Sequence, residues 1–134
     1  MTKKAVHVSG KRKKAIARAT VYEGSGKIMI NKRLLQYYTP ELSRLRIQEP
    51  LILAGDFANK VDININVIGG GFQAQTDAAR LCVARGLLEF TGSKQLKQIF
   101  LDYDRNLLIA DVRRNEPHKP NDSKPRKKRQ KSYR

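Results

Sequence analysis

An alternating stretch that leads into three consecutive glycines constrains the fold of this chain more than any other feature. From Val61 to Val67, valine or isoleucine alternates with aspartate or asparagine, which is the period of two expected of a strand with one face on a core. Glycine occupies positions 69–71, where the absence of Cβ lets the backbone adopt positive φ or approach another backbone or a phosphate. The pattern predicts a strand followed by a tight turn.

The segment after the glycines is predicted to be a long helix. Between Gln73 and Phe90 there is no proline and many residues are apolar, and Gly92 follows where a helix C-terminus favours a left-handed residue. Small side chains form the centre of one helical face, which would let the helix lie close to a sheet: Ala78, Ala79, Cys82 and Gly86. The other side is expected to face solvent or a partner and carries Gln73, Thr76, Asp77 and Arg80.

Residues before this unit indicate a pair of strands. Ala15–Tyr22 is rich in alanine, isoleucine, threonine, valine and tyrosine, and Lys27–Ile30 alternates polar with apolar residues. A Gly-Ser-Gly sequence at 24–26 separates the two segments, so we expect them to form a β-hairpin.

Capping signals predict two further helices. Thr39 followed by Pro40 is a helix start, and Pro50 is expected to end or break that helix, with another helical turn over residues 51–54 before Gly55. Ser93 can cap a short helix, and residues 107–112 read as a last extended segment. The apolar face of the short helix would hold Leu96, Ile99 and Phe100. Together these elements suggest an α+β sandwich of two layers.

Charge divides the chain into a nearly neutral body and two cationic ends. The formal net charge is +16, yet residues 19–112 hold 11 bases against ten acids. Residues 1–18 carry seven Lys or Arg and no acid, and residues 113–134 carry ten bases against two acids. Three prolines and almost no apolar side chains follow residue 112, so this segment should stay disordered until it meets a partner. We predict a body over 1–112 with a basic N-terminal strand and an extended tail over 113–134.

Charge of this magnitude, concentrated outside a neutral body, favours a nucleic-acid partner over a solvated charge run or a localisation signal. Flexible cationic chains neutralise phosphates and position the nucleic acid without reading its bases. The glycines lack the Gly-Lys-Ser/Thr ending of a nucleotide-binding loop, and both a purely structural turn and an RNA backbone contact are open for them. The residues expected to bind RNA are Lys11, Arg12, Lys13, Lys14, Arg18, Gly69, Gly70, Gly71, Arg113, Arg114, Lys124, Arg126, Lys127, Lys128 and Arg129.

Signals for catalysis, metals and membranes are weak. The single Cys82 excludes an internal disulfide and a cysteine-based zinc cluster, and it is expected to be a small buried hydrophobe. His7 and His118 lie far apart in sequence without a third ligand. Three acids near the end of the body are typical turn residues without a partner base: Asp102, Asp104 and Asp111. We expect no enzyme activity, cofactor, metal or small-molecule substrate, no membrane span or signal peptide, and a cytosolic protein.

The run GGGFQAQTDAARLCVARGL, from Gly69 to Leu87, closely resembles the signature of the ribosomal small-subunit protein nine family. That signature pairs a triple glycine with a glutamine, small helix residues and a basic residue at these spacings. Cys82 departs from the Gly, Ser or Ala usual in the family but is also small. The resemblance extends to GKRKKAIARA near the start and to the tail ending KKRQKSYR, so it covers nearly the whole chain in an archaeal or eukaryotic style.

The resemblance implies a structural constituent of the small ribosomal subunit with a role in translation. The body would bind rRNA in the subunit head beside neighbouring head proteins, and the tail would reach the anticodon stem-loop of the peptidyl-site tRNA. By matching positions, the tRNA contacts would be Lys131, Tyr133 and Arg134, although Tyr133 departs from the lysine common in bacterial members. A general nucleic-acid chaperone or compacting protein is the alternative, because it would share the charge.

For the fold, the resemblance implies a domain like the second domain of ribosomal protein five. Such a domain contains a βαβ unit with a left-handed crossover, against the usual handedness. Composition and periodicity do not lead to this expectation.

Overall fold

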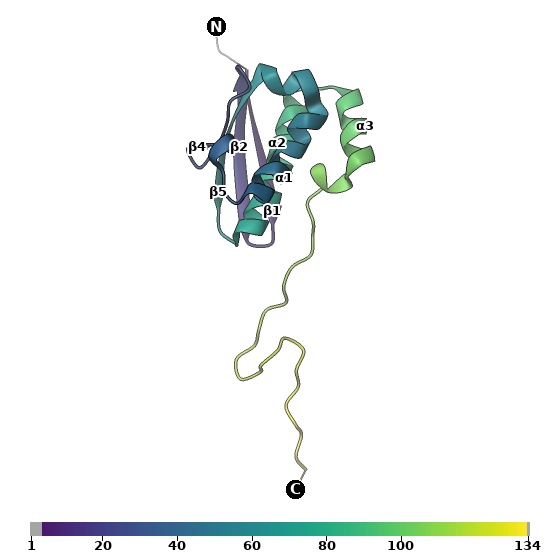
Figure 1. Ribbon diagram of the computed structural model, residues 1–134. Helices are drawn as coiled ribbons and strands as arrows, with labels where there is room; N and C mark the ends of the chain where they lie inside the picture. The colour runs from purple at the N-terminus through teal and green to yellow at the C-terminus, as the bar shows by residue number, and fades with distance from the viewer. Residues whose placement is uncertain (1–3, 134) are drawn as a thin grey trace.

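The alternating stretch forms the central strand of a five-stranded sheet in the computed structural model, which describes residues 4–133 (Figure 1). This strand, β5 (Val61–Ile68), pairs antiparallel with β2 (Ala15–Glu23) and parallel with β3 (Ile28–Ile30). Strand β1 (Ala5–Arg12) lies outside β2, and β4 (Arg33–Leu34) lies outside β3. The strand order is therefore β1-β2-β5-β3-β4.

The predicted hairpin between Ala15–Tyr22 and Lys27–Ile30 is wrong, because β5 lies between β2 and β3. Strand β5 pairs with β2 over eight residue positions, whereas β3 is only three residues long. The hairpin partner of β2 is β1, and the chain turns between them at Lys13, which adopts a left-handed φ of 52°. Lys13 and Lys14 were interpreted from the sequence only as part of a charge cluster, so the β1–β2 turn that they form was not predicted.

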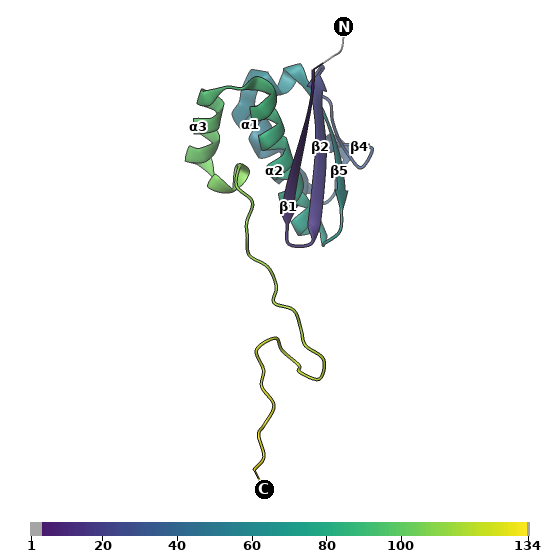
Figure 2. The same ribbon diagram turned by 180° about the vertical axis from the view of Figure 1, so that it is seen from behind.

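Three helices cover one face of the sheet, which confirms the α+β expectation (Figures 1 and 2). Helix α2 (Phe72–Thr91) packs on β1 and β2, and α1 (Glu41–Ala54) packs beside it. Helix α3 (Lys94–Tyr103) lies farthest from the sheet (Figure 2). Because β3 and β5 are parallel neighbours and α1 lies between them in the chain, these elements form a βαβ unit.

The small-residue face of α2 approaches the sheet as closely as the sequence predicts. A Cβ added at Gly86 would lie only 2.6 Å from Cγ2 of Val21, and one at Gly10 would lie 2.8 Å from the carbonyl oxygen of Ala78. Cys82 is fully buried in the same contact. Bulk on either side of this interface would push helix and sheet apart.

The opposite side of α2, expected to face solvent or a partner, is only partly exposed: Gln73 is exposed and Asp77 is half-buried. Thr76 and Arg80 are 0% and 6% exposed, because α1 and the segment after α3 pack against them. The Arg80 guanidinium donates to Glu49 Oε2 at 2.7 Å and to Asp104 Oδ2 at 3.0 Å. Burial raises the pKa of Asp104, but hydrogen bonds from the backbone of Asn106 and from Arg80 outweigh this and hold the pKa below its ordinary value. Arg80 therefore joins three elements.

The boundaries of α1 also differ from the prediction. Helix α1 begins at Glu41 after Pro40 in the N-cap position, and Thr39 does not cap it. Residues 51–54 are helical as expected, but Pro50 neither ends nor breaks the helix, which continues through it to Ala54. The ring of Pro50 is fully buried, so its packing in the core offsets the hydrogen bond that proline cannot donate.

The predicted cap of the last helix is confirmed, since Ser93 Oγ accepts a hydrogen bond from Leu96 N at 3.3 Å. Leu96 and Phe100 are buried as expected, but Ile99 is 45% exposed, so it does not share their face. Residues 107–112 do not form the expected extended element. A short 3₁₀ turn, η3 (Arg105–Leu107), ends in the core instead.

From residue 108 to residue 133 the chain contains no helix or strand. Its first residues contact the body through Leu108, Asp111 and Arg114, and Figure 1 shows the rest running away from it. Its division from the body at residue 113 and its ordering on a partner stay predictions. None of the helices in residues 4–133 has the length and hydropathy required to span a bilayer.

Candidate nucleic-acid interface

The glycine loop and the β1–β2 turn are in backbone contact at one end of the body. Gly69 and Gly70 have left-handed φ values of 74° and 67°. A Cβ at Gly69 would lie 2.6 Å from the Lys14 carbonyl oxygen, and one at Gly70 would lie 2.9 Å from the Ala15 nitrogen. These two glycines are therefore needed for the turn itself, because any side chain would collide with backbone.

Gly71 differs from the two glycines before it. It is the N-cap of α2 with an ordinary φ of −92°, and a Cβ placed there would meet nothing within 4 Å. No side chain caps this helix start. The first amides of a 20-residue helix and the positive end of its dipole therefore face open space at this point.

Cationic residues from two distant parts of the chain surround this helix start. The first residues of the tail return to the β1–β2 turn, where the Arg114 guanidinium donates to the carbonyl oxygen of Lys13. Lys13 and Lys14 are exposed, and neither ammonium group has a hydrogen-bond partner within residues 4–133. A shallow hollow lies between these segments and is lined by Lys13, Lys14, Gly70, Gly71, Ala74, Arg114 and Asn115. The structure thus brings together three of the predicted RNA-binding stretches.

Arg12 points to the helix side, although it was predicted with the same cluster. Its Nη1 lies 3.3 Å from Asp111 Oδ2, its Nε lies 3.6 Å from Asp77 Oδ2, and its side chain is 17% exposed. Arg113 also pairs with Asp111, through Nη2 and Oδ2 at 2.7 Å. This hydrogen bond holds the pKa of Asp111 well below its ordinary range. Asp111 therefore links β1 to the base of the tail, and the charge of Arg12 is balanced within the protein.

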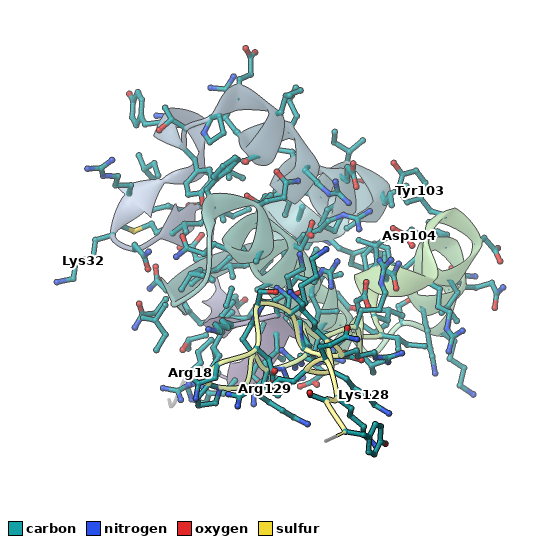
Figure 3. The ribbon with its side chains drawn as sticks, turned by 90° about the horizontal axis from the view of Figure 1, so that it is seen from below. Arg18, Lys32, Tyr103, Asp104, Lys128 and Arg129 are labelled. Carbon is teal, nitrogen blue, oxygen red and sulfur yellow. The ribbon has the colours of Figure 1, made fainter. Side chains whose placement is uncertain are left out.

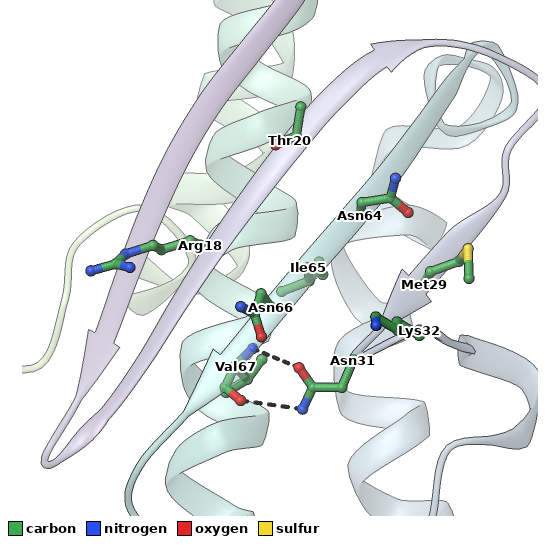
Figure 4. Close-up of a pocket in the computed structure, with 9 residues that line it drawn as sticks. All are labelled: Arg18, Thr20, Met29, Asn31, Lys32, Asn64, Ile65, Asn66 and Val67. Atoms are coloured by element: carbon green, nitrogen blue, oxygen red, sulfur yellow. Dashed lines mark hydrogen bonds between the residues drawn. The ribbon is translucent and has the colours of Figure 1, made fainter.

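A second hollow lies on the uncovered face of the sheet, over β2, β5 and β3 (Figure 4). Arg18 is the predicted RNA-binding residue at this place. Asn31 follows β3 with a left-handed φ of 47°, and its side-chain amide extends the sheet: Oδ1 accepts from Val67 N at 2.8 Å and Nδ2 donates to Val67 O at 3.2 Å. The lining residues are Arg18, Thr20, Met29, Asn31, Lys32, Asn64, Ile65, Asn66 and Val67. The asparagines are not among the RNA-binding residues predicted from the sequence, although strand alternation places Asn64 and Asn66 outward.

The predicted residues of the tail are exposed. Arg126 pairs with Glu116, its Nε lying 2.9 Å from both carboxylate oxygens. Lys128 and Arg129 extend from the tail (Figure 3). Tyr133 is 88% exposed, and Arg134 lies outside the described residues. Contacts of these side chains with rRNA or tRNA stay predictions.

The residues weighed for catalysis have ordinary structural surroundings. Cys82 is buried, its Sγ donates to the Ala17 carbonyl oxygen at 3.3 Å, and burial raises its pKa to about 12. His7 Nδ1 lies 3.1 Å from Thr20 Oγ1 on the sheet surface. Asp102 accepts a hydrogen bond from Gln98. Within residues 4–133 the structure contains no cluster of three potential metal ligands.

Comparison with known proteins covers the body and the tail together. The profile of the family described as ribosomal protein S9/S16 matches residues 10–134. Small ribosomal subunit protein uS9 of Methanococcus vannielii is 52% identical over 133 residues, which are 98% of this chain and 99% of the relative. The protein of the same name from Methanococcus maripaludis strain C7 is 53% identical with the same coverage. The chain therefore belongs to the ribosomal protein S9/S16 family.

Proposed function

We propose that this chain is a structural constituent of the small ribosomal subunit and acts in translation by binding rRNA in the subunit head. Its tail would reach the anticodon stem-loop of the peptidyl-site tRNA. Membership of this ribosomal protein family supports a structural, non-enzymatic role in the cytoplasmic ribosome with rRNA as a partner. Contact with neighbouring head proteins is part of the proposal. The rRNA and tRNA contacts of individual residues belong to the proposal.

The observation that carries the rRNA contact is the hollow at the start of α2. Two exposed lysines, Lys13 and Lys14, the open helix N-terminus at Gly71 and the Arg114 guanidinium lie around it. Each of these groups attracts phosphate by a separate route: a mobile ammonium, a row of unpaired amides with the helix dipole, and a planar guanidinium. Folded RNA crowds phosphates together, so a site with several cationic groups relieves their repulsion. Arg12 contributes less, because Asp77 and Asp111 balance its charge.

The tail contact rests on charge and on the family match. Residues 113–134 hold ten bases against two acids, and the family profile extends to residue 134. Its side chains have little apolar surface to pack, so the segment is suited to follow RNA phosphates. Lys124, Lys127 and Lys131 would neutralise phosphates along its path, and the last residues would lie at the tRNA.

The first experiment is sedimentation of the tagged protein with ribosomal subunits at low and at high salt. The unaltered chain should stay with small subunits through the high-salt wash. The double variant Lys13→Gln with Lys14→Gln should dissociate at lower salt, with the salt dependence of rRNA affinity reduced by about two counterions, near 0.9 per lost contact. A matched control is Lys94→Gln with Lys97→Gln, which removes the same charge from the exposed surface of α3.

An equal loss of subunit binding in both double variants would mean that the protein is held by its net charge alone and not by the hollow at the start of α2. Spreading over all nucleic acid at low salt and release at high salt would favour a general nucleic-acid chaperone. Deleting residues 131–134 tests the tail separately: the fold and subunit binding should be unchanged, and retention of tRNA by the subunit should weaken. Unchanged tRNA retention would contradict the role proposed for the terminus.

A further inference from the structure

One face of the sheet is not covered by any described element. All three helices lie on the other side (Figures 1 and 2). The strand register aligns the outward side chains in rows across three strands. One row contains His7, Thr20 and Asn64, and the next contains Ser9, Arg18 and Asn66.

The charge of this open face is positive. Lys11 on β1, Arg18 on β2 and Lys32 in the β3–β4 turn are exposed. Arg18 and Lys32 project outward from the sheet, on the far side of the body from Asp104 (Figure 3). Among the outward positions described on β1, β2 and β5, the acidic residue is Asp62. Its Oδ1 already accepts hydrogen bonds from the backbone nitrogens of Ser25 and Lys27, both at 2.8 Å. The remaining potential suits a polyanion.

Several polar groups of the open face have no partner inside the protein. Across residues 4–133, no hydrogen bond or ion pair joins the side chains of Arg18, Lys32 or Asn66 to another group. Arg18 and Asn66 are direct partners in the register of β2 and β5, and both line the hollow of Figure 4. The guanidinium and the amide of one register row, with the Lys32 ammonium across β5, supply donors for phosphate oxygens, and the amide oxygen can accept from a ribose 2′-hydroxyl.

We infer that this open face is a second RNA-docking surface, which holds the sugar–phosphate backbone of an rRNA segment separate from the one at the start of α2. The inference rests on the proposed function, since it takes rRNA as the partner. It adds Lys32, Asn64 and Asn66 to the RNA contacts, and it assigns Arg18 to this surface and not to the cluster at the β1–β2 turn.

Backbone contact fits this surface better than base stacking. Platforms for unpaired bases present aromatic rings on which the bases stack. Besides the imidazole of His7, the outward positions described on β1, β2 and β5 hold one aromatic ring, that of Tyr22. Its hydroxyl accepts a hydrogen bond from Asn64 Nδ2 at 3.1 Å, so the ring lies at the edge of the asparagine row. Docking of a protein is also less well supported, because protein interfaces depend on buried apolar anchors. The exposed large apolar side chain of the open face is Ile68, 52% exposed beside Ile16 at the end of β5 and outside the hollow. The outer surface of α1, where Leu42 and Ile52 are 80% and 76% exposed, is more apolar.

Crosslinking from a single introduced thiol tests the inference. The Asn66→Cys variant would carry a thiol-linked photoreactive group, and Cys82 would stay unlabelled because it is buried with a pKa raised to about 12. The matched control is Gln98→Cys, another exposed amide position, on α3. In assembled small subunits, crosslinks to rRNA should be at least about five times more frequent from position 66 than from position 98. Crosslinks from position 66 to proteins alone, or none above the control, would overturn the inference.

Binding to full-length small-subunit rRNA separates this surface from the first site. The double variant Arg18→Gln with Lys32→Gln should bind about tenfold more weakly, with its salt dependence reduced by about two counterions. If the Lys13→Gln, Lys14→Gln variant binds rRNA more weakly and the Arg18→Gln, Lys32→Gln variant does not, the second RNA-docking surface is rejected and the proposed function stands. If neither variant binds more weakly than the α3 control, both are wrong. Thermal unfolding of each variant checks that its fold is intact.

Discussion

The two faces of the sheet are made by alternate residues of the same strands, yet they have opposite properties. On β2, Ala17 is fully buried against α2, whereas its neighbour Arg18 is exposed on the open face. The buried positions of the inner face hold only apolar residues on β2 and β5, and on β1 and β2 glycine and alanines let the helix pack closely. The outer face has no covering layer and is mainly polar and cationic, apart from apolar residues such as Ile68 at the end of β5. Since a strand alternates strictly, a single sequence can assign stability to one face and RNA contact to the other. Substitutions on the two faces should therefore change different measurements.

The largest effect on stability is expected at the tightest contact of the inner face. Gly86→Leu would place a side chain where even a Cβ would lie 2.6 Å from Val21. Helix α2 would have to move off the sheet, and we expect the free energy of unfolding to fall by about 1–3 kcal/mol. Chemical denaturation measures this change, and rRNA affinity per folded molecule should remain that of the unaltered chain.

The matched control for this substitution is Glu89→Leu, which adds the same side chain at an exposed position of α2. Its stability should change by less than about 0.5 kcal/mol. Equal stability of the two variants would mean that the close helix-to-sheet contact does not exist as described.

The inner face should also be sensitive to alkaline pH through Cys82. Burial raises the pKa of its thiol from 9.0 to about 12, so above pH 9 the unfolded chain releases this proton and the folded protein does not. Stability is therefore lost as pH rises, by about 1.4 kcal/mol at pH 10. Because lysines and tyrosines titrate in the same range, the measurement is the difference between the unaltered chain and Cys82→Ala at pH 8 and at pH 10.

At pH 8 the difference in unfolding free energy between the two proteins reflects packing alone. The change in this difference between pH 8 and pH 10 measures the contribution of thiol ionisation. A constant difference would contradict a strongly raised pKa. Rapid alkylation of Cys82 in the folded protein at pH 8 would contradict it as well, since the thiolate is the reactive form.

Some predictions from local patterns were confirmed, whereas the Thr39 cap and the break at Pro50 were wrong although they too were local. Predictions that depended on distant partners were wrong. Strict alternation identified β5, and small residues at helical spacing identified the packed face of α2. The pairing of β2 with β5 could not be read from its neighbours in the chain, because the paired residues are 38 to 52 positions apart, from Glu23–Val61 to Ile16–Ile68. Arg80 was predicted to face solvent or a partner because a charged residue opposite an apolar face normally is exposed. Its burial depends on Glu49 and Asp104, carboxylates from two other elements.

The candidate site shows the same division. The sequence identified the glycines and the lysines separately, and only the fold brings Gly70, Lys14 and Arg114 to one hollow. Composition selected cations, so Arg12 was included although it is paired internally. Uncharged Asn64 and Asn66 were not selected, although the alternation that predicted the strand also places them on its open side.

The smallest effect is expected at Asp62, where the outer face has a structural role of its own. Its carboxylate accepts hydrogen bonds from Ser25 and Lys27, and a Cβ on Gly24 would lie only 2.1 Å from its Cγ, so it holds the β2–β3 loop in place. Asp62→Ala should lower the free energy of unfolding by about 1 kcal/mol, because these hydrogen bonds are partly exposed to water. Asp62→Asn, which keeps an acceptor oxygen, should lose less.

Hydrogen bonds from the loop backbone hold the pKa of Asp62 below 3.8, and the one from Lys27 has the largest effect. The contribution of Asp62 is therefore present above the unfolded pKa and is lost as pH falls through the lower folded pKa, so the difference between the unaltered chain and Asp62→Ala should shrink in acid. Affinity for rRNA at neutral pH should not fall in either variant, since no cation is removed from the open face. A weaker rRNA complex in a folded Asp62→Ala protein would show that the arrangement of the loop contributes to binding, and the separation between the two faces would then fail at this strand end.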